Sequence, residues 1–188
     1  MAVFEFNAVN HAQKRAVANA LAINAIERDG RIPIAASANC LQPDRQNDNG
    51  WDQGLLFLNP SQVWLQPPGC VTQMVASNYQ PKLVRCDVSG GKSILDANAK
   101  RSEDGRTLVL QVVNPTDAAV TVRIQITGFR PNKPEAQATE LLGPLDAVNS
   151  AGKTDAIAPR QSTWKHQINN GSTIRTFPAC SFTVLRLE

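Results

Sequence analysis

The start of the sequence has the strand–helix–strand order of a β-α-β unit, and this order constrains the fold most strongly. Residues 3–7 are predicted to form a strand, residues 11–29 an alanine-rich helix that stops at Gly30, and residues 32–37 a second strand. The second strand is a nearly unbroken apolar run, which is typical of a parallel strand covered on both faces. Two parallel strands cannot provide that cover. We therefore expect the unit to belong to a larger α/β fold, or to dock on a partner chain or on the domain that follows it.

The sequence from residue 82 onward has the pattern of an antiparallel β-sandwich. Apolar and polar residues alternate over residues 120–127, and the apolar residues of 107–114 include one regular face. Gly105 lies in a predicted hairpin turn, where a residue that tolerates positive φ is favoured. Residues 128–159 contain several prolines and predict long loops and irregular edge strands. The predicted fold class is mainly β with an N-terminal α/β piece.

Charge and cysteine spacing exclude several classes of function. The 188 residues carry a formal net charge of +3 with scattered lysines and arginines, so no nucleic acid partner is expected. No apolar run approaches the roughly 20 residues of a membrane helix and no signal peptide is recognised, so we expect no membrane partner and a cytoplasmic location as written. Neither a metal site nor a cofactor is expected, and buried free thiols are the favoured interpretation of the four widely spaced cysteines Cys40, Cys70, Cys86 and Cys180.

One carboxylate is unusual for its position in the first strand. Glu5 lies between Phe4 and Phe6 in a segment that is otherwise typical of a short buried strand. A buried carboxylate costs several kcal/mol unless it is paired or hydrogen-bonded. Taken alone, such a residue is usually ion-paired or at a sheet edge, and the alternative is a chemical role.

The segment between the predicted β-α-β unit and the predicted sandwich contains a distinctive series of motifs. A polar loop ends at Trp51 and is followed by apolar segments, a Pro-Pro-Gly turn at residues 67–69 and a Gln-Met pair at residues 73–74. Together with the glutamate strand and the alanine-rich helix, this order resembles the C-terminal part of the family 51 glycoside hydrolases, the α-L-arabinofuranosidases, over most of the chain. Three motifs carry the resemblance. VFEFN (residues 3–7) occupies the place of the family's S-E-Y-A segment, and ASAN (residues 36–39) that of the end of a barrel strand. WD (residues 51–52) and LF (residues 56–57) together resemble the family's Trp-x-Pro-Asp-x-x-x-Phe segment.

The resemblance implies the last β/α units of a (β/α)8 barrel followed by an antiparallel jelly-roll-like β-sandwich. Under this interpretation residues 1–77 are a remnant of the barrel and residues 78–188 are the sandwich. The resemblance also implies that Glu5 is the catalytic nucleophile and that Asn39 and Trp51 bind substrate. For Trp51, a role in sealing the base of the barrel is an equal alternative.

Departures from the family pattern leave the sugar preference open. Phe6 and Asn7 replace the usual Tyr-Ala after the glutamate, and Gln53 and Gly54 replace Pro-Asp after the tryptophan. Cys70 stands where an aromatic residue is more typical.

The resemblance further implies that the active site is incomplete. A retaining glycosidase needs a second carboxyl group roughly 5 Å from the nucleophile. In the family this acid/base belongs to an Asn-Glu pair on another barrel strand, and the sequence contains no Asn-Glu pair. Asp44, Asp48 and Asp52 are interpreted as turn residues rather than substitutes. We therefore expect the isolated chain to be inactive, and to need a missing barrel half or a homo-oligomer to act on an arabinofuranosyl-containing saccharide.

A second function of another class is weighed beside this one. The chain would then be a stand-alone β-sandwich module with a carbohydrate-binding or structural role. Dedicated sugar-binding modules usually present an aromatic platform, and here aromatic residues make up only 5% of the sequence, with a single tyrosine. The residues therefore favour the hydrolase interpretation.

Overall fold

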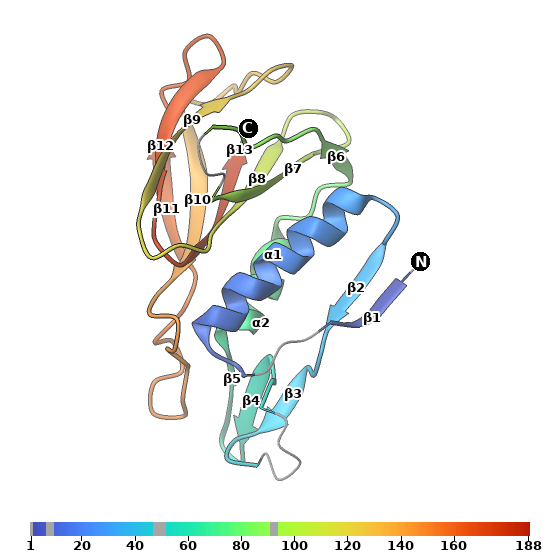
Figure 1. Ribbon diagram of the computed structural model, residues 1–188, viewed down its shortest axis with the longest axis vertical. Helices are drawn as coiled ribbons and strands as arrows, with labels where there is room; N and C mark the ends of the chain where they lie inside the picture. The colour runs from blue at the N-terminus through green and yellow to red at the C-terminus, as the bar shows by residue number, and fades with distance from the viewer. Residues whose placement is uncertain (1, 7–9, 47–51, 91–93) are drawn as a thin grey trace.

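In this computed structural model, residues 2–6, 10–46, 52–90 and 94–188 are described. Their secondary structure is mainly β, as predicted (Figure 1). The described helices are α1 (Gln13–Asp29) and α2 (Pro67–Ser77). The described strands are β1 (Ala2–Phe6), β2 (Ile34–Ser37), β3 (Leu41–Pro43), β4 (Leu56–Asn59), β5 (Gln62–Leu65), β6 (Lys82–Val84), β7 (Asp96–Arg101), β8 (Leu108–Asn114), β9 (Val120–Gln125), β10 (Glu135–Leu142), β11 (Arg160–Lys165), β12 (Ser172–Phe177) and β13 (Ser181–Leu187).

The predicted β-α-β unit is present. β1 and β2 pair in parallel, with Val3 opposite Ala35, and α1 connects them. Gly30 ends α1 with φ of 69°, a left-handed conformation that favours glycine. The expected cover on both faces of the second strand is absent among the described residues, because most of β2 is exposed and the side chain of Ile34 is 58% exposed.

The predicted antiparallel sandwich is also present. Its larger sheet has six strands in the order β11-β10-β13-β8-β7-β6, and its second layer is the β12–β9 ribbon. The turn predicted at Gly105 joins β7 to β8, with φ of 73° at the glycine. A separate sheet of β3, β4 and β5 lies at the far end of the molecule (Figure 1).

The prediction of only loops and irregular edge strands for residues 128–159 is wrong for β10. This eight-residue strand lies inside the large sheet and pairs with β11 on one side and β13 on the other. Its buried residues include Ala136 and Ala138, which are small and lack the β-branched or aromatic side chains that mark strands in a sequence. Close packing in the middle of the sandwich favours these alanines, and it also hides the strand from pattern analysis.

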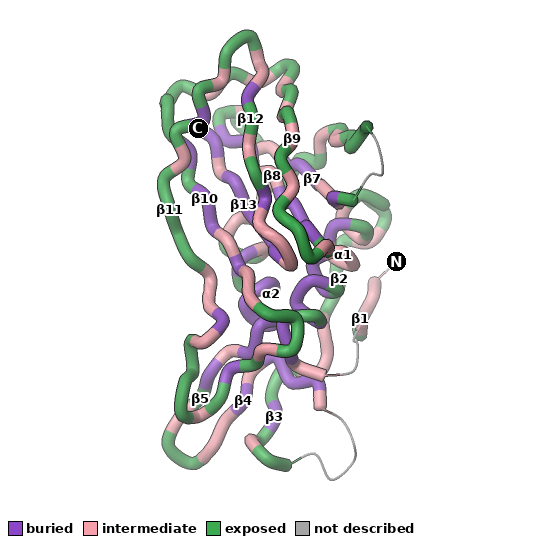
Figure 2. Tube along the Cα trace, turned by 60° about the vertical axis from the view of Figure 1, so that its left-hand side comes forward, coloured by how far each residue is buried: buried purple, intermediate pink, exposed green. Residues whose placement is uncertain are grey.

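Both faces of the large sheet are covered, and the helices provide one of the covers. Val109 and Val113 of β8 are fully buried in a cluster with residues of α1 and α2. On the opposite face of β8, Leu108 and Val112 belong to a second cluster that includes residues of the β9–β12 ribbon. Figure 2 shows buried residues concentrated in the helices and the middle of the sheet, while β1 and β2 are mostly exposed or intermediate. The helix of the β-α-β unit therefore packs on the sheet that follows it in the chain, which is one of the expected alternatives.

A polar network fixes the position of α1 on the sheet. The Glu27 carboxylate lies 2.7 Å from Nζ of Lys100 on β7, and it accepts hydrogen bonds from the amides of Asn98 (2.8 Å) and Gln111 (2.8 Å). The Lys100 side chain is only 4% exposed. Such a network is directional, so it specifies where along the sheet the last turns of the helix lie.

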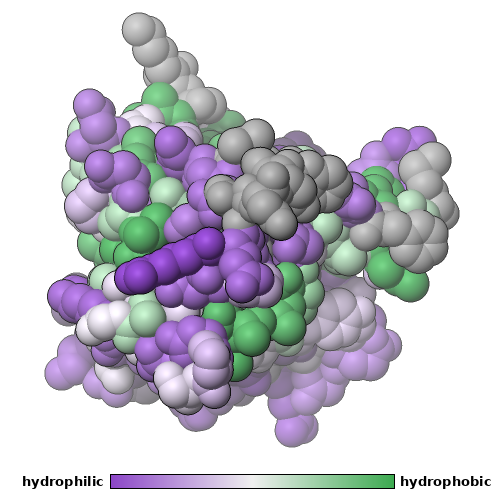
Figure 3. All heavy atoms as spheres, turned by 90° about the horizontal axis from the view of Figure 1, so that it is seen from below, coloured by the Kyte–Doolittle hydropathy of each residue, from purple (hydrophilic) through white to green (hydrophobic). Residues whose placement is uncertain are grey.

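Apolar side chains remain exposed at several places on the described surface. Figure 3 shows green apolar groups beside strongly hydrophilic ones at the end of the molecule that faces the viewer. The most exposed large apolar residues, each more than half exposed, are Ile34, Leu41, Val63, Tyr79 and Ile174. Three of these five belong to the region before α2, which is consistent with a part of the molecule that has surfaces left to cover. Neither described helix has the length and apolar composition that a membrane crossing requires.

We predict that Glu27→Gln lowers the free energy of unfolding by about 3–5 kcal/mol, because Lys100 would remain buried without its counter-charge. Urea unfolding monitored by circular dichroism measures the change. Glu103→Gln is the matched control, since Glu103 pairs with Lys82 at 3.0 Å but its side chain is 77% exposed, and a loss below about 1 kcal/mol is expected. Equal losses in the two variants would show that the network does not hold the helix.

We also predict a pH-dependent loss of stability that depends on Cys70. Burial raises the pKa of this thiol from 9.0 to about 11. Between these values the unfolded chain loses the thiol proton while the folded chain keeps it, so the free energy of unfolding falls as the pH rises. The loss is at most about 3 kcal/mol. Urea unfolding of the original chain and of Cys70→Ala, at about pH 7.5 and about pH 10.5, measures it. Identical pH dependence in the two proteins would contradict the assignment.

Candidate functional site

The candidate site lies at the carboxyl ends of β1 and β2. Glu5 is the fourth residue of β1, and its side chain is exposed rather than buried between the flanking phenylalanines. Asn39 follows the end of β2 by two residues, is half-buried, and donates a hydrogen bond from Nδ2 to the Leu41 carbonyl oxygen (3.1 Å). Because β1 and β2 are parallel neighbours, Glu5 and Asn39 lie toward the same edge of the sheet. Trp51, the third predicted site residue, lies outside the described residues.

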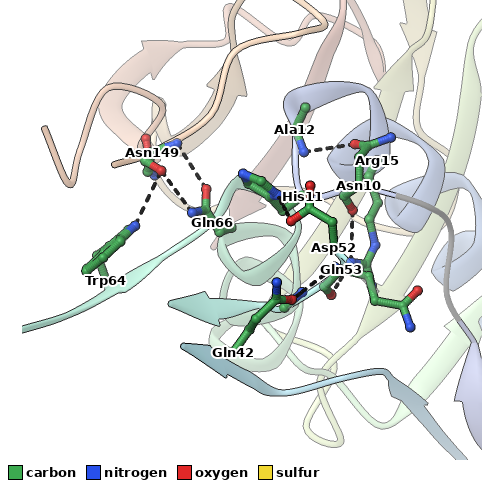
Figure 4. A network of polar contacts seen from close by, with 11 residues as sticks. Asn10, His11, Ala12, Arg15, Gln42, Asp52, Gln53, Trp64, Gln66 and Asn149 are labelled. Carbon is green, nitrogen blue, oxygen red and sulfur yellow. Dashed lines mark hydrogen bonds and ion pairs between the residues drawn. The ribbon is translucent and has the colours of Figure 1, made fainter. Parts of the chain in front are cut away.

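Arg15 connects the loops at this edge, and sequence analysis did not identify it. It lies in the first turn of α1 with 1% of its surface exposed. Its guanidinium donates hydrogen bonds to the carbonyl oxygens of Asn10 (3.0 Å), Ala38 (2.5 Å) and Gln53, and to Oγ of Ser37 (3.4 Å). One side chain thus joins the loop after β1, the end of β2 and the loop that leads to β4. Figure 4 shows Arg15 with two of these partners, Asn10 and Gln53. A cation in the first turn of a helix opposes the helix dipole, and this was the available sequence signal.

The positive charge of Arg15 is buried, and the negative charge of Asp52 acts on it from a distance. Burial lowers the pKa of the guanidinium to about 10, and the negative charge of Asp52 acts in the opposite direction. Asp52 itself contacts His11, with 2.7 Å between Oδ1 and Nδ1, although no aligned hydrogen bond joins the two atoms. The His11 ring packs against Phe57, with 4.5 Å between the centroids. Asp52 therefore belongs to the structural network of the loop rather than to a free turn.

Two glutamines hold the remaining backbone of the site. Oε1 of Gln42 accepts hydrogen bonds from the backbone N–H groups of Gln53 (3.1 Å) and Gly54 (2.9 Å). A Cβ atom on Gly54 would lie 2.6 Å from Cβ of Gln42, so this close approach requires glycine. The amide of Gln66 exchanges hydrogen bonds with the backbone of Asn149 (2.8 and 3.0 Å) and thereby connects the start of α2 to the sandwich.

The arrangement presents a carboxylate on the surface of a strand end that is held by a buried arginine network. Among the described residues no group of three or more His, Cys, Asp or Glu side chains is placed to hold a metal ion. Asp44 lies in the turn after β3, and its carboxylate is 3.9 Å from the guanidinium of Arg45. Asp48 lies outside the described residues. This edge presents the exposed Glu5 carboxylate and the half-buried Asn39 amide.

Comparisons with known proteins agree with these features. The sequence matches the family of alpha-L-arabinofuranosidase C-terminal domains over residues 6–181. No curated protein matches it. The chain is similar to the α-L-arabinofuranosidase from Thermotoga maritima, solved as an arabinose complex, with 20% identity and a TM-score of 0.84. It is similar to the thermostable family 51 enzyme from Thermotoga petrophila RKU-1, also with 20% identity and a TM-score of 0.84.

A third similar structure is the family 51 arabinofuranosidase from Xanthomonas axonopodis pv. citri, with 17% identity and a TM-score of 0.73. The similarity covers 100% of this chain for the two Thermotoga proteins and 97% for the Xanthomonas protein. It covers only 42%, 43% and 37% of those proteins. The chain therefore spans less than half the length of these structures, and at such identities the similarity shows the fold alone.

We predict that Arg15→Met destabilises the chain by about 2–4 kcal/mol, because several buried carbonyl oxygens lose their donor. Urea unfolding gives the size of the effect, and hydrogen exchange at residues 37–42 and 52–55 shows where it acts. Arg31→Met removes a guanidinium that is paired with Asp29 on the surface, and it serves as a control with no measurable change expected. Unchanged exchange at both segments in Arg15→Met would contradict the proposed connection between the loops.

Proposed function

The chain belongs to the family of alpha-L-arabinofuranosidase C-terminal domains, and from this premise we propose that it is the C-terminal portion of a retaining glycoside hydrolase. The proposed substrates are arabinose-containing polysaccharides. In such an enzyme a carboxylate attacks the anomeric carbon and forms a glycosyl-enzyme intermediate, while a second carboxyl group protonates the leaving oxygen and then activates water. Glu5 is the proposed nucleophile.

The observation that carries this proposal is the position of Glu5 at the carboxyl end of a parallel β-strand. Enzymes built on (β/α)8 barrels place their catalytic groups at the carboxyl ends of the strands. The β1-α1-β2 unit is a parallel β-α-β unit, the kind of unit from which such barrels are built, and the side chain of Glu5 is exposed at its carboxyl end.

Asn39 and Trp51 are the proposed substrate-binding residues. Asn39 follows the neighbouring strand, so its amide lies at the same edge as Glu5 and offers hydrogen-bonding groups for sugar hydroxyls. Trp51 precedes Asp52, which the His11 contact holds beside the site. An indole ring in this loop would offer an apolar face for a sugar ring.

We propose that these 188 residues do not catalyse hydrolysis alone. The sequence has no Asn-Glu pair to supply the acid/base, and Asp52 already contacts His11. The described partners of β1 and β2 are only each other, whereas a (β/α)8 barrel has eight strands. The proposed partner is a polypeptide segment that supplies the other barrel strands. In this view the barrel part ends near residue 77, the last residue of α2, and residues 78–188 form the sandwich.

A chimeric enzyme tests the proposal. The corresponding C-terminal portion of the Thermotoga maritima arabinofuranosidase is replaced by this chain, and hydrolysis of para-nitrophenyl α-L-arabinofuranoside is measured. We expect turnover in the chimera and none above background with the isolated chain. Glu5→Gln in the chimera should lower kcat by at least about a thousandfold, because no nucleophile remains.

Glu103→Gln, an equivalent substitution in the exposed turn between β7 and β8, is the matched control and should leave turnover unchanged. A Glu5→Gln chimera as active as the Glu103→Gln chimera would exclude Glu5 as the nucleophile. Turnover by the isolated chain that Glu5→Gln abolishes would show that the chain or its oligomer contains its own acid/base. A folded but inactive chimera, with arabinan binding by the isolated chain, would favour the binding-module alternative.

A further inference from the structure

The β9–β12 ribbon leaves one edge of β9 without a strand partner among the described residues. The backbone N–H of Ile126, just after β9, donates to the Gly171 carbonyl oxygen (2.7 Å) on the β12 side. Backbone groups of alternate residues point to the same side of a strand. The N–H and C=O groups of Thr121, Arg123 and Gln125 therefore point toward the open edge.

A cavity of about 760 Å³ runs along this open edge, between the ribbon and the large sheet. Its lining includes the consecutive residues 122–127. Successive side chains point to opposite faces of a strand, so a run of consecutive residues lines a cavity only where the cavity follows the edge of the strand. Residues 84–89, which begin at the last residue of β6, also line the cavity. The cavity thus lies between residues 84–89 and the open edge of β9.

The wall that the large sheet and the ribbon present to this cavity is apolar and incompletely covered. Leu110 on β8 and Val122 and Ile124 on β9 face the space between the layers but are only half-buried. The remaining apolar side chains of the wall include Val112, Leu185 and Leu187. Removing apolar area from water is favourable, so an occupant with apolar side chains on one face would be stabilised here.

The geometry points to a β-strand binding site along the open edge of β9. The occupant is an extended segment with alternating apolar and polar residues, whose backbone pairs with Thr121, Arg123 and Gln125 and whose apolar side chains fill the cavity. A row of backbone donors and acceptors at strand spacing matches a polypeptide rather than a saccharide. The segment comes from the rest of the proposed enzyme. In the Thermotoga proteins, the part that has no counterpart in this chain makes up more than half of the length. This source rests on the proposed function.

A short synthetic peptide in which valine and threonine alternate tests the site. In the chain alone, we expect the amides of Thr121, Arg123 and Gln125 to exchange with solvent much faster than those of Val122 and Ile124, which pair with β12. The peptide at ten times its dissociation constant should slow the three amides about tenfold. A peptide of the same composition with valines and threonines in separate blocks should not, because its apolar groups do not fall on one face.

Arg123→Pro removes one backbone donor of the open edge, and it should abolish peptide binding. The ribbon should remain folded, because this N–H does not pair with β12 and proline is tolerated at such edge positions. Arg123→Thr is the matched control: it removes the same charge, keeps the N–H and should bind the peptide as the original chain does. Thermal unfolding of both variants verifies that each is folded.

Three results would overturn the site: no binding of the alternating peptide by the folded chain, equal binding by Arg123→Pro, or slow exchange of the three edge amides without peptide. None of these measurements depends on activity. Failure of the site is therefore distinguishable from failure of the proposed function, which the chimera tests. An active chimera whose three edge amides still exchange rapidly would likewise overturn the site and leave the proposed function intact.

Discussion

The packing of α1 on the large antiparallel sheet is the interaction on which the rest of the structure depends. Strands β8, β10 and β13 are apolar on both faces, so one layer of the sandwich alone cannot bury them. α1 and α2 cover the second face of the large sheet, and the Glu27–Lys100 pair sets the position of α1 on this sheet. Each fully buried aliphatic side chain in this shared core contributes roughly 1.5–3 kcal/mol, so the two parts of the chain stabilise each other.

This arrangement explains why the candidate site keeps its shape although only two described strands form its sheet. One surface of α1 contacts the sandwich, and its first turn holds the loops around β1 and β2 through Arg15. The site edge is therefore positioned by a helix whose own place is determined elsewhere in the molecule. Most of β2 is exposed, so this strand contributes little to the shared core.

Several features were predictable because they depend on local pattern. The β-α-β unit follows from a long alanine-rich helix between two apolar strands and from a glycine at the helix end. β8 and β9 follow from alternation. β10 was missed because its buried face uses Ala136 and Ala138, and the apolar second face of β8 was not foreseen because its cover comes from helices earlier in the chain. Glu5 lies in a segment with the sequence pattern of a short buried strand, and its side chain is exposed.

The sequence by itself determined the type and order of most elements, the family resemblance and the choice of Glu5 and Asn39 as residues of interest. These depend on side-chain periodicity, turn residues and short motifs, which are local properties of the chain. Only the tertiary structure decided that the helices share a core with the sandwich and that Arg15 joins three loops. It also decided that one edge of β9, which has no strand partner among the described residues, lies beside a cavity. Such features depend on contacts between residues far apart in the chain, and the sequence pattern of either partner does not specify the other.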